Sequence, residues 1–91
     1  MVGKYVINIR RVKKKFTDVL EGKITFEEAS AWASKRMLER ELGTLELDSL
    51  EDRSKIFSGL TYLLGIDLLE SPGVYFFSIQ NIKDEFDELF K

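Results

Sequence analysis

Residues 25–43 read TFEEASAWASKRMLERELG, and this stretch decides the fold of the chain. It opens with a capping box, in which the Thr25 hydroxyl accepts from the backbone N–H of Glu28 while the Glu28 carboxylate accepts from that of Thr25. Small and apolar residues then recur at helical spacing along one face, at Phe26, Ala29, Ala33 and Met37. The pattern predicts a long amphipathic helix that ends at the closing glycine, with Trp32 and Arg36 together at the edge of its stripe.

A second amphipathic segment precedes this helix. Its apolar residues follow spacings of four, three, four and three, which place them on one helical stripe: Tyr5, Ile9, Val12, Phe16 and Val19. Gly22 fits the end of such a helix. The sequence therefore predicts a first helix that carries this whole stripe.

Two further helices are predicted downstream. The run Asp48-Ser49-Leu50-Glu51 repeats the capping pattern, and Gly65 is placed to close that helix in the left-handed conformation. Its apolar face comprises Leu50, Phe57, Leu60 and Leu64, with Leu63 beside it. Ser78 is expected to cap the last helix, with Phe77 stapled against Ile82. The stripe of this last helix comprises Ile79, Ile82, Phe86, Leu89 and Phe90.

The segment between these two helices contains a turn. Pro72 and Gly73 are the pair preferred at the centre of a type II turn, and residues 74–77 (VYFF) are β-like in composition. Because no partner strand is evident, we interpret residues 74–77 as an extended buried connection, with a small β element as the alternative. The prediction is an all-α fold, a compact bundle of about four helices in a single domain over residues 1–91.

The composition excludes several classes of function. The chain has 91 residues, enough for one hydrophobic core, and 44% of them are apolar. It contains no cysteine and no histidine, which rules out thiolate and imidazole catalysis and sulfur-based zinc sites. The six glycines fit neither a phosphate-binding loop nor a dinucleotide fingerprint. We therefore expect no catalytic residue, no metal and no cofactor, and hence a protein that is not an enzyme.

No secretion signal or membrane span is recognisable in the sequence, so a cytoplasmic location without membrane contact is expected. The acidic residues of the last helix lie between its apolar positions, where a solvated face is expected: Asp84, Glu85, Asp87 and Glu88. They are therefore not proposed as a catalytic or metal-binding group.

Charge is unevenly distributed along the chain. Residues 1–40 contain ten Lys and Arg against five Asp and Glu, whereas residues 41–91 contain four against eleven, for a net charge of −2. The basic half contains one dense cluster in the first helix, comprising Arg10, Arg11, Lys13, Lys14 and Lys15. Such a cluster is typical of surfaces that meet phosphate backbones, and a plain solvated helix face is the competing interpretation. No helix-turn-helix or RNA-binding signature accompanies it.

The acidic half offers a different binding surface. Acidic residues around the third helix and the turn would attract a basic protein partner if they cluster in space: Glu46, Asp48, Glu51, Asp52, Asp67 and Glu70. The competing interpretation is local, since Asp48 and Glu51 suit a helix cap and Asp67 suits its own loop. A core position is the favoured interpretation for Trp32, and an interface position is the alternative. The same two alternatives apply to Tyr75.

Two segments carry a resemblance to a known group of proteins. GKITFEEASAWA (Gly22–Ala33) and LLGIDLLESPGVY (Leu63–Tyr75) are similar to small helical bacterial immunity proteins of contact-dependent and other polymorphic toxin systems. The resemblance implies stoichiometric binding and neutralisation of a cognate toxin domain, often a nuclease. No contact residue is carried over from that group. From expected exposure and chemistry, the candidates are Glu46, Asp48, Glu51, Asp67, Glu70 and Tyr75. The alternative function is a nucleic-acid-binding or regulatory module that uses the basic first helix, and the oligomeric state stays open.

Overall fold

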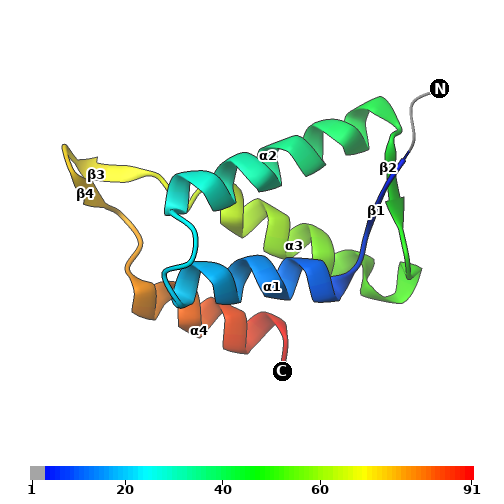
Figure 1. The fold of residues 1–91 in the computed structure, drawn as a ribbon. Helices are drawn as coiled ribbons and strands as arrows, with labels where there is room; N and C mark the ends of the chain where they lie inside the picture. The colour runs from blue at the N-terminus through cyan, green and yellow to red at the C-terminus, as the bar shows by residue number, and fades with distance from the viewer. Residues whose placement is uncertain (1–3) are drawn as a thin grey trace.

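The computed structural model of the chain describes residues 4–91. It combines four α-helices and one short 3-10 helix with two two-stranded sheets, so the all-α prediction is wrong (Figure 1). In chain order the elements are β1 (Tyr5–Ile7), α1 (Ile9–Leu20), α2 (Phe26–Leu42), β2 (Leu45–Leu47), η1 (Leu50–Asp52), α3 (Arg53–Leu64), β3 (Leu69–Ser71), β4 (Val74–Tyr75) and α4 (Ile79–Leu89). Among these, no helix has the length and apolar character needed to cross a membrane.

The first sheet pairs β1 with β2 in parallel, and α1 and α2 form the connection between the two strands. Tyr5 was predicted within the first helix, but it lies in β1 opposite Leu45. The helix starts only at Ile9, because Asn8 is extended (φ −141°, ψ 170°) and its side chain accepts from the backbone N–H of Arg11 at 2.9 Å. A three-residue strand is too short to reveal its alternation, and its partner lies far along the chain.

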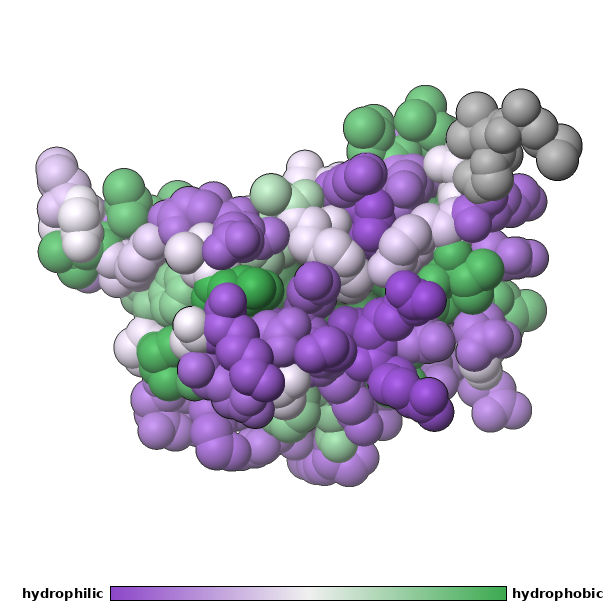
Figure 2. Space-filling view, in the orientation of Figure 1, coloured by the Kyte–Doolittle hydropathy of each residue, from purple (hydrophilic) through white to green (hydrophobic). Residues whose placement is uncertain are grey.

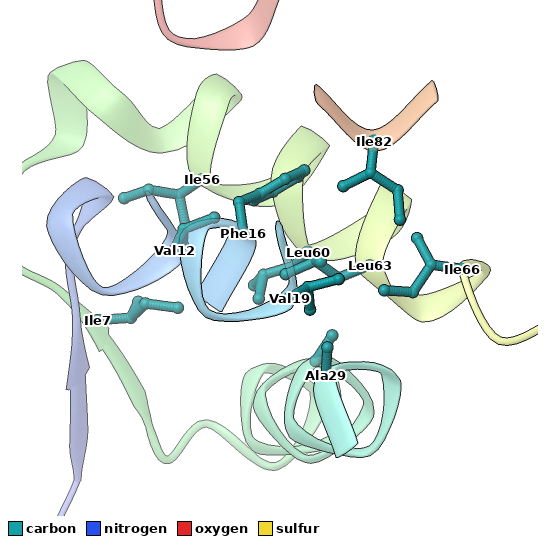
Figure 3. Close-up of a cluster of buried hydrophobic side chains, with 11 residues drawn as sticks. Ile7, Val12, Phe16, Val19, Ala29, Ile56, Leu60, Leu63, Ile66 and Ile82 are labelled. Carbon is teal, nitrogen blue, oxygen red and sulfur yellow. The ribbon is translucent and has the colours of Figure 1, made fainter. Parts of the chain in front are cut away.

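The core lies where α1, α2 and α3 meet, and α4 covers one side of it (Figure 3). Its fully buried side chains include Val12, Phe16 and Val19 of α1, Ala29 and Ala33 of α2, Ile56, Leu60 and Leu63 of α3, and Ile7, Ile66 and Ile82. Gly59 permits the close approach of α3 to α1, since a Cβ there would lie 2.7 Å from Cγ1 of Val12. This packing fixes which face of α1 is left for solvent.

The predicted caps are confirmed for two helices. Thr25 and Glu28 form the capping box of α2, and Gly43 ends that helix in the left-handed conformation at φ 74°. Ser78 caps α4, where the side chain of Asn81 accepts from the Ser78 backbone N–H at 2.9 Å. Each of these caps involves residues three apart, which is why the sequence alone predicts them.

The prediction for the third helix is wrong in its details. Residues 50–52 form a 3-10 turn, and no side-chain cap hydrogen bond is made by Ser49 or Asp52. This turn displaces Leu50 from the core face, so its side chain is 77% exposed. Gly65 does close α3, but it does so in the right-handed region at φ −100°.

Residues 74–77 are not a buried connection. Val74 and Tyr75 form β4, which pairs with β3 in an antiparallel hairpin that projects beyond the helices (Figure 1). The turn lies where predicted, with Gly73 at φ 78°. Phe76 is 57% exposed and Val74 is 50% exposed. The missing partner strand was Leu69–Ser71, directly before the turn, whose composition alone does not mark it as β.

Candidate functional site

The basic cluster of α1 does not form one surface, because its five cations point in three directions. Arg10 lines a separate hollow of about 180 Å³ together with Asp48 and Asp52. Lys13 extends toward α4, where its Nζ lies 5.5 Å from the ring centroid of Phe90. The remaining three cations, Arg11, Lys14 and Lys15, border one hollow together with Trp32 of α2. The structure therefore brings three of the five predicted residues together.

These three cations border a cleft of about 210 Å³, here called the α1–α2 cleft, lined by Tyr5, Arg11, Lys14, Lys15 and Trp32. The cleft depends on three elements: α1 supplies the cations, α2 supplies the indole and β1 supplies the phenol. Figure 1 shows α1 beside α2 with β1 at one end of both, and Figure 2 shows hydrophilic residues crowded over α1 in the same view. The result is a hollow that combines aromatic rings with positive charge.

Arg11 and Lys15 are held by aromatic rings. The Nη1 of Arg11 donates to the Tyr5 hydroxyl at 3.2 Å, and the Arg11 Cζ lies 5.2 Å from the Tyr5 ring centroid. The Nζ of Lys15 lies 5.4 Å from the centroid of Trp32. Within residues 4–91, no carboxylate comes within ion-pair distance of Arg11 or Lys15. Their charge therefore has no acidic partner in the described part of the chain.

Lys14 differs from its two neighbours. Its Nζ lies 3.2 Å from Oδ1 of Asp18, one turn further along α1. Asp18 is only 7% exposed, so this lysine balances a carboxylate that is largely removed from water. Lys14 thus adds less free positive charge to the α1–α2 cleft than Arg11 or Lys15.

A buried arginine lies behind the two aromatic rings. The Cζ of Arg36 lies 3.7 Å from the ring centroid of Tyr5 and 5.7 Å from that of Trp32, and its side chain is 6% exposed. Its Nη2 donates to Oε2 of Glu39 at 3.2 Å. Its Nε lies 2.6 Å from Oε1 of the same carboxylate, so both oxygens of Glu39 contact the guanidinium and the two side chains form an ion pair. Arg36 therefore fixes Tyr5 and Trp32 in place.

The predicted position of Arg36 beside Trp32 is confirmed, but its place in a site does not follow from the sequence pattern. The spacing of apolar residues along a helix does not predict that an arginine is buried. The available signal was its spacing of four from Trp32 and of three from Glu39, which allows contacts with both.

The pKa of Tyr5 reports the electrostatics of the α1–α2 cleft. Burial raises the pKa of the phenol, but the hydrogen bond from Arg11 and the positive charges of Arg11 and Arg36 outweigh burial, and the pKa lies below its usual value. A site that stabilises a phenolate also favours other anions. The α1–α2 cleft is therefore suited to a negatively charged ligand.

The six predicted protein-binding residues lie at two opposite ends of the molecule (Figure 1). Glu46, Asp48 and Glu51 lie at the end that carries β1 and β2, whereas Asp67, Glu70 and Tyr75 lie on or beside the β3–β4 hairpin. The structure therefore does not gather them into one acidic face.

Tyr75 has a clear local role. Its hydroxyl donates to Oε2 of Glu27, and its ring packs against Phe26 with centroids 4.4 Å apart. Both contacts attach the hairpin to the first turn of α2. The same hydrogen bond lowers the pKa of Glu27 and raises that of Tyr75, because it favours the carboxylate and the neutral phenol.

Tyr75→Phe is expected to raise the pKa of Glu27 toward its ordinary value, because the hydrogen bond from Tyr75 is the largest cause that lowers it. Because the pKa of Glu27 is lowered in the folded state, its contribution to stability is present above the ordinary glutamate pKa and is lost as pH falls through the folded value. The stability difference between wild type and variant should therefore shrink on acidification. NMR titration of the Glu27 carboxyl measures the pKa directly. Tyr62→Phe is the control, and an unchanged Glu27 pKa in Tyr75→Phe would contradict the assignment.

The largest groove of the three described hollows lacks the positive charge found in the α1–α2 cleft. An open groove of about 520 Å³ on α3 and α4 is lined by Ser54, Phe57, Ser58, Thr61, Tyr62 and Glu85, with a carboxylate but no cation. Over residues 4–91, no group of three or more acidic side chains is arranged to hold a metal ion. The α1–α2 cleft is thus the candidate site.

Comparison with known proteins gives one finding. A family model described as YxzC DNA-binding protein matches residues 2–89, almost the full length of the chain. No match was found among curated proteins or among solved structures.

The family match overturns the resemblance to immunity proteins, and with it the prediction of a toxin inhibitor. The two segments that carried the resemblance, Gly22–Ala33 and Leu63–Tyr75, contain the cap of α2 and the hairpin turn. Caps and turns are selected by local backbone geometry in proteins of any function, so they are poor evidence of a shared activity.

Proposed function

Because the chain belongs to the YxzC DNA-binding protein family, we propose that it binds DNA, and that the surface of α1 around the α1–α2 cleft makes the contact. Nucleic-acid binding through the basic first helix is the alternative function that the sequence predicts. The proposal involves association alone, with no bond-making step.

The observation that carries the proposal is the pair of cations Arg11 and Lys15, which converge on one cleft without a carboxylate partner in residues 4–91. Phosphate contacts supply much of the affinity of proteins for DNA, because each cation that neutralises a phosphate releases condensed counterions. A guanidinium and an ammonium that already lie at the surface can do this without first breaking an ion pair.

The distribution of acidic residues would orient the molecule on DNA. The β1–β2 end carries Glu46, Asp48 and Glu51, and the hairpin end carries Asp67 and Glu70. Like charges repel, so both ends would be held away from the phosphate backbone. The middle of α1 is then the part of the surface that meets the strand.

Replacing Arg11 and Lys15 together by glutamine is expected to weaken binding to mixed-sequence duplex DNA by about 10- to 100-fold at low salt. The plot of log affinity against log salt should become shallower by about 2, since each phosphate contact contributes about 0.9 to the slope. Fluorescence anisotropy of a labelled oligonucleotide at stepped salt concentrations measures both quantities. Lys14 is left in place because Asp18 would otherwise lose its partner.

The matched control is Lys55→Gln with Lys83→Gln, which makes the same change in net charge on α3 and α4. It should keep the wild-type slope. Equal losses in the two double variants would show that net charge, and not this surface, governs binding. Failure of the wild-type protein to bind DNA at low salt would exclude the function itself.

A further inference from the structure

We propose that the α1–α2 cleft accepts one nucleotide of a DNA strand, with its base stacked on Trp32 and its phosphate held by Arg11 and Lys15. This inference rests on the proposed function and specifies its substrate: single-stranded DNA, or a nucleotide extruded from a duplex, binds the cleft, and a fully paired duplex does not fill it.

The size of the cleft limits its occupant. Its volume of about 210 Å³ lies below the roughly 300–1,000 Å³ of pockets that hold drug-sized ligands. It suits a unit as small as a base with its phosphate. It is also concave, whereas reading a duplex groove requires a protruding element such as an exposed helix. In a duplex the bases are stacked inside, so only an unpaired nucleotide can bring a base into this hollow.

The walls of the cleft provide a stacking surface next to phosphate ligands. Proteins that bind single strands combine aromatic rings, which accept any base, with cations that follow the backbone. Here Trp32 and Tyr5 line the same cleft as Arg11 and Lys15. One nucleotide could therefore contact an aromatic ring and a cation of this cleft at the same time.

The rings are held ready for a ligand. The guanidinium of Arg36 contacts both Tyr5 and Trp32 from within the protein and is itself fixed by Glu39. Rings fixed in this way lose little freedom when a base stacks on them, which favours binding.

The position of Lys15 shows how the cleft would respond. In the free protein its Nζ lies over the Trp32 ring, 5.4 Å from the centroid. Lysine is flexible and this contact is weak where both side chains are partly open to solvent, so an arriving base can displace the ammonium. The displaced ammonium would then pair with the phosphate of the same nucleotide.

Trp32 is the single tryptophan of the chain, so its fluorescence reports on the cleft alone. The experiment titrates the full chain with three ligands of equal length: single-stranded oligothymidylate, the same strand without bases, and a blunt duplex. Anisotropy of labelled strands measures binding separately. We expect strong quenching by oligothymidylate, and little or none by the abasic strand or the duplex at concentrations where they bind.

Substitution of the indole provides the second arm. Trp32→Ala should weaken oligothymidylate binding by about tenfold and weaken abasic and duplex binding much less, because a stacking contact is lost and no cation is removed. Trp32→Phe keeps a ring and should recover most of the affinity. This rescue separates stacking from a folding defect.

The outcomes discriminate between the two proposals. Equal quenching by oligothymidylate and the abasic strand would show a phosphate contact without stacking and overturn this inference, while DNA binding stands. Equal quenching by the duplex would overturn it as well, since a paired strand would then reach the indole. Absence of binding to all three ligands would overturn both proposals.

Discussion

Phe16→Ala is expected to lower the free energy of unfolding by about 3–5 kcal/mol. The Phe16 side chain is fully buried, and its ring lies within 6.0 Å of the rings of Tyr62, Phe86 and Phe90, measured between centroids. It thereby links α1 to α3 and to the C-terminal part of the chain. Removing it forfeits apolar burial and leaves a cavity between three helices. For a domain whose total stability is about 5–15 kcal/mol, this loss is severe.

Denaturant unfolding followed by circular dichroism measures the effect. Phe16→Leu, which keeps most of the volume, should retain a folded state if the alanine variant does not. Phe76→Ala is the matched control, because that ring is 57% exposed on the hairpin. Its effect should stay within about 0.5 kcal/mol, as for most surface positions. Similar losses for Phe16→Ala and Phe76→Ala would contradict the described core.

Arg36→Met is expected to lower the free energy of unfolding by about 2–4 kcal/mol. Breaking a buried ion pair by removing one partner leaves the other charge without compensation, at a cost of about 3–5 kcal/mol when burial is complete. Here the Arg36 side chain is 6% exposed and that of Glu39 is 19% exposed, so water relieves part of the penalty. The loss of the guanidinium also removes the contact behind Tyr5 and Trp32.

The double variant Arg36→Met, Glu39→Met isolates the ionic part of this effect. It should be more stable than Arg36→Met alone, because no uncompensated charge is left. The control pair is Lys83 and Asp87, 3.1 Å apart on the exposed face of α4, where the same substitutions should show coupling of about 0–1 kcal/mol. If the effects of Arg36→Met and Glu39→Met simply add, the two side chains do not act as a buried pair.

Both substitutions are also expected to change the α1–α2 cleft, because its shape depends on the packing of α1 and of the two aromatic rings. Phe16 holds α1 against the core, and Arg36 holds the aromatic rings that face α1. The positions of Arg11 and Lys15 relative to Trp32 therefore follow from the packing of α1. If Phe16→Ala or Arg36→Met weakens DNA binding, the free energy of unfolding of that variant must be measured as well, to separate a loss of contacts from a loss of folded protein.

The sequence by itself determined those features that need only residues a few positions apart. The capping box of Thr25 and Glu28, the cap at Ser78 and the turn at Pro72 and Gly73 are all present as predicted. Their physical basis is local, since a side chain satisfies a backbone group three residues away or a glycine adopts a positive φ. Because such local features occur in proteins of any function, the resemblance to immunity proteins that rested on them was wrong.

Only the tertiary structure decided the rest. Tyr5 belongs to a strand because Leu45 offers it a partner, and Arg36 is buried because the ring of Tyr5 packs against its guanidinium. The convergence of cations from α1 on an indole from α2 likewise depends on how two helices pack. Such contacts join residues distant in the chain, and helical spacing carries no information about them. The sequence supplied the charges and rings, and packing placed them in one cleft.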